Sequence, residues 1–597
     1  MHKSIRVLSN LAQSKTLLPG FGRPLTYEPN EQDPDYVGRP FPSVLRSSDW
    51  RHLLPLTTLR ELTMLRVMNA ITDKVDWRIK IKKKRFAMRW KQEILNSGLD
   101  VTEKMANWCM EELVHKARMV PNLPAIPPPV FVYNGDVFKW DKFSGSAKLK
   151  ADLQKAVRKF EEKIPENMKD WHPNSGGKVW DLVHPSLFPL VYGRTRILAN
   201  GEMTDLKDCI PRCGQGEIIP VPQTVDPGGS SESAAPSMYA YSAKFQWLPC
   251  EVDITGRDPK ITSYINNLHP HTELPLYSLI EKVIKASISL WEKSLAPYKS
   301  PKFKYQQRIK YNISSFDPPE PRGRNAFNYI DKKLSWEELP RHVVLPEPSS
   351  KFKLIKRPPP FSLKAGYRKK GLQVIVKLAN IQLTPDKPDY NGGTWHVEGQ
   401  MNEHIVATSL YYYDCHNVTP SALYFRQLVD DDTVNIRYPQ DVHDWLPAVF
   451  GVRQNGPGLQ EVGGVETREG RLLSFPNILQ HRVGPFKLRD PTRPGHRKVL
   501  ALFLVDPNIK IISTAHVPCQ RQDWWQEWKE APPKWIKQLD THVEELSQSH
   551  TLEQANFPIS LKEAEELRLE LMDERKEFVL RENDALETDN VISLCEH

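Results

Sequence analysis

Apolar side chains recur every three residues in the first part of the chain. Between Leu56 and Ile71 they are Leu59, Leu62, Leu65, Met68 and Ile71, which is the spacing of one helix face. Further helices are predicted to begin near Thr102, to run over 146–163 and to run from 276 to about 293. We expect residues 1–125 to form a helical, partly basic N-terminal region, which ends in the proline-rich run 121–129.

The pattern changes to alternation in the later part of the chain. Leu372, Val374, Val376 and Leu378 alternate with mostly polar neighbours, as in a half-buried strand. Strands are also predicted for 405–413, 422–428 and 499–505, together with a hairpin around Asn134-Gly135. Several strands in one window favour a jelly roll over a parallel βαβ sheet.

These elements predict the α+β class and three regions. The first is the helical region 1–125. The second is a catalytic domain over 126–537, with helical elaborations and a jelly-roll core near 370–520. The third is an acidic helical tail over 538–597, which covers the basic N-terminal region or binds a partner.

The tract Asn391–Gly399 reads Asn-Gly-Gly-Thr-Trp-His-Val-Glu-Gly. Positions i and i+2 of a strand point to the same face. His396 and Glu398 can therefore reach one metal ion together, and a third ligand must come from elsewhere.

The best candidate for the third ligand is His481. A strand-like apolar run breaks at Pro476 and leads to this histidine. Two imidazoles and one carboxylate form a facial triad, which suits Fe(II) oxygenases because it leaves coordination positions open. The competing histidines are His404, His416, His443, His496 and His516.

Arg497 opens the apolar run Val499–Val505. An arginine at the mouth of a buried strand needs an anionic partner, and its planar guanidinium suits a carboxylate. Four other residues are candidates for lining the pocket: Trp395, Asn402, Tyr411 and Tyr413.

The order H-x-E, distant His and Gly-x-Arg resembles the 2-oxoglutarate and Fe(II) dependent dioxygenases. This resemblance implies a double-stranded β-helix, in which His396, Glu398 and His481 hold iron and Arg497 binds the far carboxylate of 2-oxoglutarate, with O₂ as the other co-substrate. The demethylase-like branch uses a lysine for this carboxylate, so Lys498 is a reserve candidate. In the dioxygenases Asp is commoner than Glu as the acidic ligand.

The wider chain also resembles an uncharacterised, mostly fungal family known only as a domain of unknown function. The residues that carry this resemblance are Ser263–Pro270 and the tract around His396. It implies no substrate.

Composition narrows the class of protein and its compartment. The chain has 597 residues, a net charge of +9 and seven scattered cysteines, which indicate reduced thiols in an intracellular protein, cytoplasmic or nuclear. No apolar run has the length of a membrane span. The basic start Met1–Pro24 keeps a mitochondrial location open, and Lys80–Lys91 keeps nucleic-acid binding open.

Three functions therefore stay open on the sequence. The leading one is a 2-oxoglutarate dependent oxygenase that acts on a protein side chain or a small metabolite. The second is a cupin-like metalloenzyme that needs no 2-oxoglutarate. The third is a non-enzymatic jelly-roll scaffold that binds partners through its charged segments.

Overall fold

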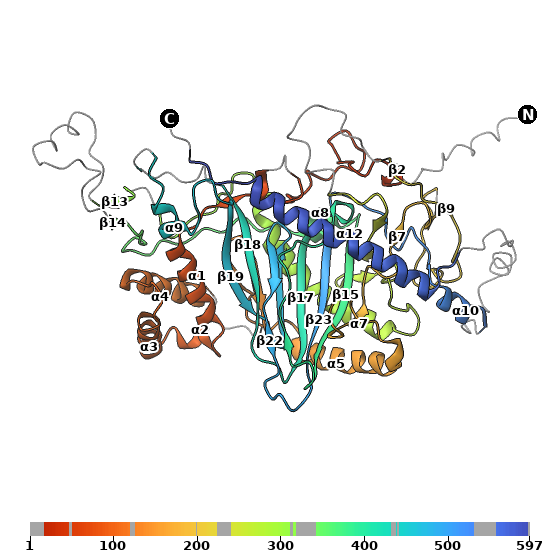
Figure 1. Cartoon of the computed structure of the whole chain (residues 1–597), viewed down its shortest axis with the longest axis horizontal. Coiled ribbons are helices and arrows are strands. Elements are labelled where there is room, and N and C mark those ends of the chain that lie inside the picture. The colour runs from red at the N-terminus through yellow and green to blue at the C-terminus, as the bar shows by residue number, and fades with distance from the viewer. Residues whose placement is uncertain are drawn as a thin grey trace, which may run out of the picture.

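Two mainly antiparallel sheets form the centre of the molecule, with helices around them (Figure 1). The computed structural model describes residues 17–46, 50–119, 126–198, 200–223, 240–310, 314–317, 342–430, 438, 441–530 and 557–594. The predicted start 1–16 and the part 538–556 of the predicted tail lie outside these residues. Among the described residues, no helix combines the length and apolar character that crossing a membrane requires.

In the described part of the chain, four α-helices precede the first long strands. They are α1 (Leu59–Thr72), α2 (Trp77–Lys80), α3 (Lys84–Leu95) and α4 (Glu103–Arg118). Thr58 caps α1 and Thr102 caps α4, each by accepting a backbone N–H of the first turn. The predicted helices near 56–71 and from Thr102 are confirmed. The basic run Lys80–Lys91 spans the end of α2 and most of α3, and nucleic-acid binding there stays a prediction.

The larger sheet has nine strands among the residues that the structure describes. Its central order is β15 (Leu372–Leu383), β23 (Gly495–Val505), β17 (Ile405–His416) and β20 (Arg471–Pro476). The hairpin of β4 (Val130–Tyr133) and β5 (Val137–Trp140) extends it beyond β20. At the other edge lie β6 (Val179–Val183), β11 (Cys250–Asp253) and β12 (Lys260–Ile261). The predicted strand at 372–383 and the hairpin around Asn134-Gly135 are confirmed.

The smaller sheet carries strands from the same part of the chain. β18 (Ala422–Asp430) pairs with β19 (Leu459–Glu466) on one side and with β21 (Gln480–Val483) on the other. A bridge between His396 and His481 continues this sheet beyond β21. The sheets therefore bring the H-x-E tract beside the predicted third ligand.

Side chains on the two faces of the larger sheet enter different cores. On β23, Ala501 and Phe503 belong to the core between the sheets, whereas Leu500 and Leu502 belong to the core beneath the helices. Those helices are α5 (Ser146–Glu162) and α7 (Leu274–Leu295), close to the predicted bounds. Alternation along a strand explains this division. The odd-numbered side chains of β23 therefore point toward the smaller sheet.

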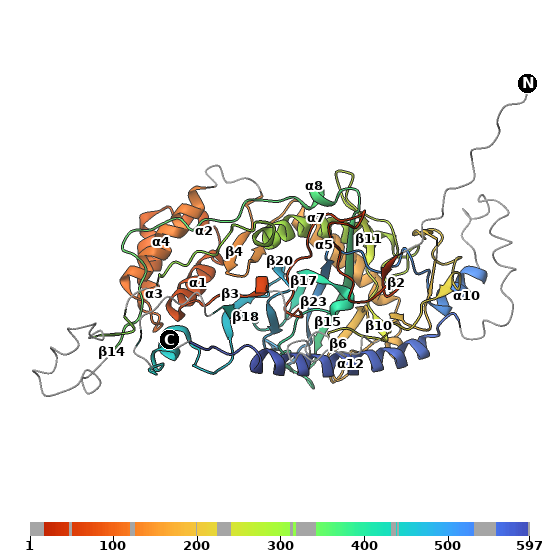
Figure 2. The same ribbon diagram turned by 90° about the horizontal axis from the view of Figure 1, so that it is seen from above.

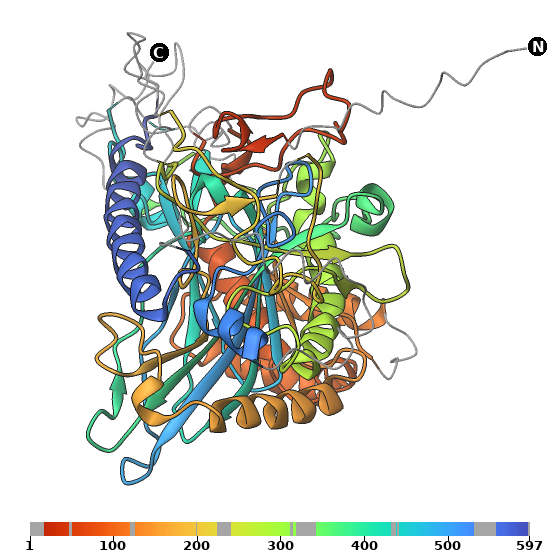
Figure 3. The ribbon, with the colours of Figure 1, turned by 90° about the vertical axis from the view of Figure 1, so that its right-hand side faces the viewer.

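The acidic helix α12 (Leu561–Thr588) crosses the open side of the two sheets (Figures 1 and 2). Figure 3 shows it upright along one edge of the molecule. Leu571 and Phe578 are buried in the core between the sheets, and Arg575 pairs with the buried Glu403 at 2.6 Å. The predicted helix is present, and it packs on the core that contains the H-x-E tract.

Candidate metal centre

His396, Glu398 and His481 lie together between the sheets. Their potential ligand atoms are all within 4.8 Å of one another. Nε2 of His481 is 3.2 Å from Oε1 of Glu398, and Nε2 of His396 is 3.9 Å from the same oxygen. The two rings are 4.4 Å apart between centroids. The structure thus assembles the three predicted ligands, and none of the competing histidines belongs to this cluster.

Backbone hydrogen bonds bring the two histidines side by side. The His396 N–H donates to the His481 carbonyl at 3.2 Å, and the His481 N–H donates back at 2.9 Å. Pro476 ends β20, and the turn after it begins with Asn477. The amide of Asn477 accepts from the Glu398 N–H at 2.9 Å and donates to the Glu398 carbonyl at 2.9 Å. Asn477, which the sequence did not single out, therefore fixes the peptide that carries the carboxylate ligand.

A hydrogen bond at Nδ1 of His396 leaves Nε2, its other ring nitrogen, available to bind a metal. Its Nδ1 lies 2.9 Å from the Thr394 carbonyl, which can only accept, so Nδ1 carries the proton. The lone pair of the neutral ring is then on Nε2, the atom that faces Glu398. Fixing a tautomer in this way is typical of metal-bound histidines.

The charges at the triad also fit a divalent cation. Burial, helped by the nearby His481, lowers the pKa of His396 to about 4. Burial alone would raise the pKa of Glu398, but the hydrogen bond with His481 and the charge of His396 hold it at about 2. At neutral pH the centre therefore offers a neutral imidazole and an ionised carboxylate, the states that bind metal.

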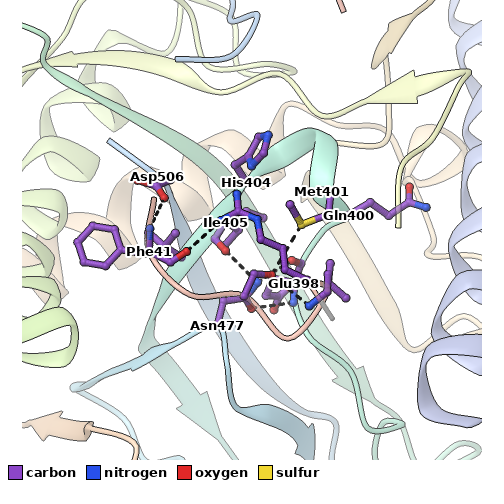
Figure 4. Close-up of a pocket in the computed structure, with 12 residues that line it drawn as sticks. Phe41, Glu398, Gln400, Met401, His404, Ile405, Asn477 and Asp506 are labelled. Atoms are coloured by element: carbon purple, nitrogen blue, oxygen red, sulfur yellow. Dashed lines mark hydrogen bonds between the residues drawn. The ribbon is translucent and has the colours of Figure 1, made fainter. Parts of the chain in front are cut away.

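The centre remains open to small molecules. The side chain of His396 keeps 31% of its surface exposed, against 14% for Glu398 and 3% for His481. A small pocket beside Glu398 is lined also by Met401, His404 and Asp506 (Figure 4). The segment 41–46 closes this pocket, held by a hydrogen bond from the Phe41 N–H to Asp506.

Arg497 lies on the face of β23 that looks between the sheets. It is 2% exposed, and its guanidinium stacks on Phe486 at 3.9 Å. Its Nε and Nη1 have no hydrogen-bond partner, and within the described part of the chain no carboxylate forms an ion pair with it. Lys498 points to the opposite face, where it pairs with Glu161 of α5 at 2.8 Å. Arg497 therefore has no carboxylate partner among the described residues, although its side chain also interacts with Cys415, whereas the reserve candidate Lys498 already has one.

Three of the four predicted pocket residues make their contacts elsewhere in the protein. Tyr411 and Tyr413 are buried in the core beneath α5 and α7, so the alternation places Tyr412 on the interior face instead. The amide of Asn402 accepts from the Ser242 N–H at 2.8 Å and donates to the Ser242 carbonyl at 2.9 Å. These three residues consequently have structural roles.

Trp395 is the fourth of these candidates. Its ring lies 4.5 Å from the guanidinium of Arg482 and 5.1 Å from that of Arg426. Its carbonyl accepts from Asn583 of α12 at 3.0 Å. Trp395 thus connects the H-x-E tract to α12.

A second group of ionisable side chains lies around β6, at the edge of the larger sheet. His172, Asp181 and His184 bring their polar atoms within 4.8 Å of one another, and the charge of Lys377 contributes to the low pKa values of Asp181 and His184. Sequence reasoning missed all four. The only signal was a pair of histidines around Asp181 in a segment rich in aromatic, Gly and Pro residues.

Comparisons with known proteins identify the family but no activity. A family model described as "Protein of unknown function (DUF4246)" matches residues 103–528, and its companion for the N-terminal domain matches residues 18–93. No curated protein matches the chain. A solved structure titled "Selenomethionine labeled Fe(II)/(alpha)ketoglutarate-dependent dioxygenase TqaL" is 11% identical, over 62% of this chain and 94% of that one. Its TM-score of 0.22 is too low to support an argument.

Proposed function

The chain belongs to the DUF4246 family of proteins of unknown function, and we propose that it is an Fe(II) and 2-oxoglutarate dependent oxygenase. His396, Glu398 and His481 would hold the iron. When bound, Fe(II) would supply the oxidative chemistry that couples O₂ and 2-oxoglutarate to hydroxylation of a C–H bond or demethylation of an N-methyl group. The chain supplies the ligands, an anion site and a partly closed space between the sheets.

The strand order supports this proposal. One sheet runs β15-β23-β17-β20, and the other runs β19-β18-β21 and then the H-x-E tract. Consecutive strands after β15 thus alternate largely between the two sheets, as the strands of a double-stranded β-helix do. We infer that fold for the core, with the metal centre at one end of the smaller sheet.

The observation that carries the proposal is the unpaired Arg497. A buried guanidinium without a carboxylate is unfavourable, because its desolvation is not offset by an ion pair. Arg497 has no such partner among the described residues, although it lies on the sheet face that looks toward the triad. A dicarboxylate co-substrate resolves this. The keto acid end would reach the metal, and the far carboxylate would accept hydrogen bonds from the two N–H groups of Arg497 that have no partner.

The two other functions make different demands on Arg497. A cupin-like enzyme without 2-oxoglutarate needs the triad but no anion site between the sheets. A scaffold needs neither. The coexistence of a prepared triad and an unpaired buried arginine therefore favours the oxygenase.

The test is an anaerobic titration of metal-free protein, first with Fe(II) and then with 2-oxoglutarate. The visible charge-transfer absorption of the chelate is recorded at each step. Three variants accompany the wild type. His396→Ala removes a ligand, Arg497→Met removes the anion site with little change in length, and Arg493→Met removes an arginine that is 78% exposed.

We expect the wild type and Arg493→Met to form the absorption band. His396→Ala should lose it, and Arg497→Met should need about 10- to 100-fold more 2-oxoglutarate, the effect of losing a charged hydrogen-bonded pair. Iron binding without a response to 2-oxoglutarate would favour the cupin-like function. A wild-type protein that binds no iron would contradict both enzyme proposals.

A further inference from the structure

A cavity of about 530 Å³ lies between the N-terminal helices and the edge of the larger sheet. The residues that line it include Trp77 and Arg78 of α2, Phe131 of β4 and Phe138 of β5, and Figure 2 shows α2 and α4 beside β4. None of the three metal ligands lines it. It has the size of a small-molecule site, about 300–1,000 Å³, and such sites occur preferentially where domains meet.

The walls of this cavity are mostly apolar. Met119, at the end of α4, and Leu354 both line it and are 68% and 55% exposed. Aromatic rings and prolines form much of the remaining wall: Trp77, Phe131, Phe138, Phe361, Pro128 and Pro129. Large apolar side chains that gather around one opening mark a surface that binds an apolar group. A ligand body in the cavity would take the two exposed side chains out of water.

Arg78 lines the cavity without a counter-ion. Its guanidinium lies 4.5 Å from the centre of the Trp77 ring, and its Nη2 donates to the Pro128 carbonyl at 3.1 Å. Nη1 makes no hydrogen bond within the described part of the chain and stays accessible to solvent. Burial of the side chain lowers the pKa of Arg78, and no carboxylate of the described residues opposes this effect. The wall therefore presents a partly desolvated positive charge with free donors.

The two carboxylates that line the cavity have partners of their own. Arg308 donates to both oxygens of Glu112, each at 2.8 Å. The Leu363 N–H donates to Glu292 at 2.8 Å. Neither carboxylate forms an ion pair with Arg78. The charge of Arg78 is thus left for an anion that the described part of the chain does not supply, although a buried charge is favourable only when it is paired.

A second cavity, of about 340 Å³, meets the first at Arg78 and Pro128, which line both. Its carboxylates Asp73 and Asp141 are both within 3.4 Å of the guanidinium of Arg468. Arg78 is therefore flanked by established ion pairs on the side of the smaller cavity and by apolar walls on the side of the larger one. An anion at Arg78 that carries an apolar body would place that body in the larger cavity.

We propose that Arg78 binds the carboxylate of a small organic acid whose apolar body, alkyl or aryl, fills the larger cavity. A carboxylate matches the planar guanidinium and can accept from Nη1 and from the second N–H of Nη2. The aromatic rings and prolines of the wall would bury the body. The cavity is separate from the metal centre, so this site does not rest on the proposed oxygenase function.

The test is isothermal titration calorimetry of the metal-free full chain with three ligands that share one apolar body. Decanoate carries a negative charge, decanol none and decylammonium a positive charge, and each is used below the concentration at which it forms micelles. The acid 2-naphthoate tests an aryl body. The variants are Arg78→Met, Arg78→Lys and Leu354→Gln. Arg89→Met, which changes an arginine of α3 whose side chain is 74% exposed, is the control.

We expect one equivalent of decanoate to bind the wild type about 10- to 100-fold more tightly than decanol, the effect of a charged hydrogen-bonded pair, and decylammonium to bind most weakly. In Arg78→Met, decanoate and decanol should bind alike. Arg78→Lys should keep part of the preference for the acid. Leu354→Gln should weaken decanoate and decanol by the same factor, up to about 10-fold, because it removes apolar contact alone. Arg89→Met should behave as wild type.

A competition experiment completes the test, because 2-oxoglutarate has two carboxylates but no apolar body and should not displace decanoate. Binding of only one of the two acids would decide between an alkyl and an aryl ligand. Four outcomes would overturn the proposal. Neither acid binds the wild type, decanol binds as tightly as decanoate, the preference for the acid survives in Arg78→Met, or 2-oxoglutarate displaces decanoate.

Discussion

Asn477 holds Glu398 by two hydrogen bonds of 2.9 Å each: the Glu398 N–H donates to the side-chain oxygen of Asn477, and the side-chain NH₂ of Asn477 donates to the Glu398 carbonyl. A second bond from this amide, 3.1 Å long, reaches the Ile405 carbonyl at the start of β17. The carboxylate ligand is thereby fixed to the larger sheet, while the two histidines belong to the smaller one.

Asn477→Ala should therefore weaken metal binding without removing a ligand. We expect the dissociation constant for Fe(II) to rise about 10- to 100-fold, as for other residues that orient metal ligands. The measurement is an anaerobic Fe(II) titration. Asn402→Ala is the matched control, because Asn402 fixes the Ser242 peptide by the same pair of bonds. If both variants lost the same affinity, the effect would be general destabilisation and the role of Asn477 would be refuted.

Arg497 is expected to lower the stability of the protein when no anion is bound. Replacing a buried ion pair by apolar side chains of similar volume is often neutral or stabilising by about 1–4 kcal/mol, and a buried charge without an ion pair carries the desolvation cost with no such attraction to offset it. Arg497→Met should therefore raise the free energy of unfolding of metal-free protein, while the wild type alone gains stability from added Fe(II) and 2-oxoglutarate. Urea denaturation measures both effects. A destabilised Arg497→Met protein would mean that the stack on Phe486 outweighs the burial of the charge.

The sequence predicted those helices and strands whose pattern of apolar residues lies within a short stretch of the chain. The helix at 56–71, the hairpin at Asn134-Gly135 and the strand at 372–383 follow from spacings that a short window contains. The H-x-E pair is also local, because one strand fixes the relation between positions i and i+2. His481 could be proposed as its partner only through order along the chain, and the bridge between His396 and His481 is the contact that joins them.

The remainder of the site depends on contacts that no short window contains. Tyr411 and Tyr413 were predicted on the correct strand but on the wrong face, since the sequence does not say which side of a strand buried on both faces looks toward the triad. The bulge that brings Asp181 to His184 is a second case, because which residue of a strand is left unpaired depends on the partner strand, which the short segment itself does not identify. The position of α12 across the sheets is a third.

Two ion pairs of α12 should differ strongly in their effect on stability. Glu403 is fully buried and its partner Arg575 is 13% exposed, whereas Lys244 and Glu570 are about half exposed. Arg575→Met leaves a buried carboxylate unpaired and should cost about 3–5 kcal/mol. Lys244→Met should cost roughly 0–1 kcal/mol. Urea denaturation of the two variants makes the comparison, and equal losses would show that α12 does not depend on the buried pair.

Acidification should destabilise the metal-free protein through His404. Burial lowers the pKa of this imidazole to about 3 in the folded protein, against about 6.5 in an unfolded chain. Between these pH values the unfolded chain binds a proton that the folded chain does not. The free energy of unfolding therefore falls as the pH falls, by up to about 1.4 kcal/mol per pH unit for this group.

The variant His404→Asn isolates this contribution. His404 has a positive φ of 44°, a conformation that asparagine tolerates well. Between pH 6.5 and 4.5 we expect the wild type to lose about 2 kcal/mol more stability than the variant, measured by urea denaturation at both pH values. His416→Asn, which changes an exposed histidine, should follow the wild type. Both variants keep His396 and His516, whose pKa values burial lowers to about 4. Part of the pH dependence should therefore persist, and an unchanged dependence in His404→Asn would show that this imidazole takes up a proton in the folded protein.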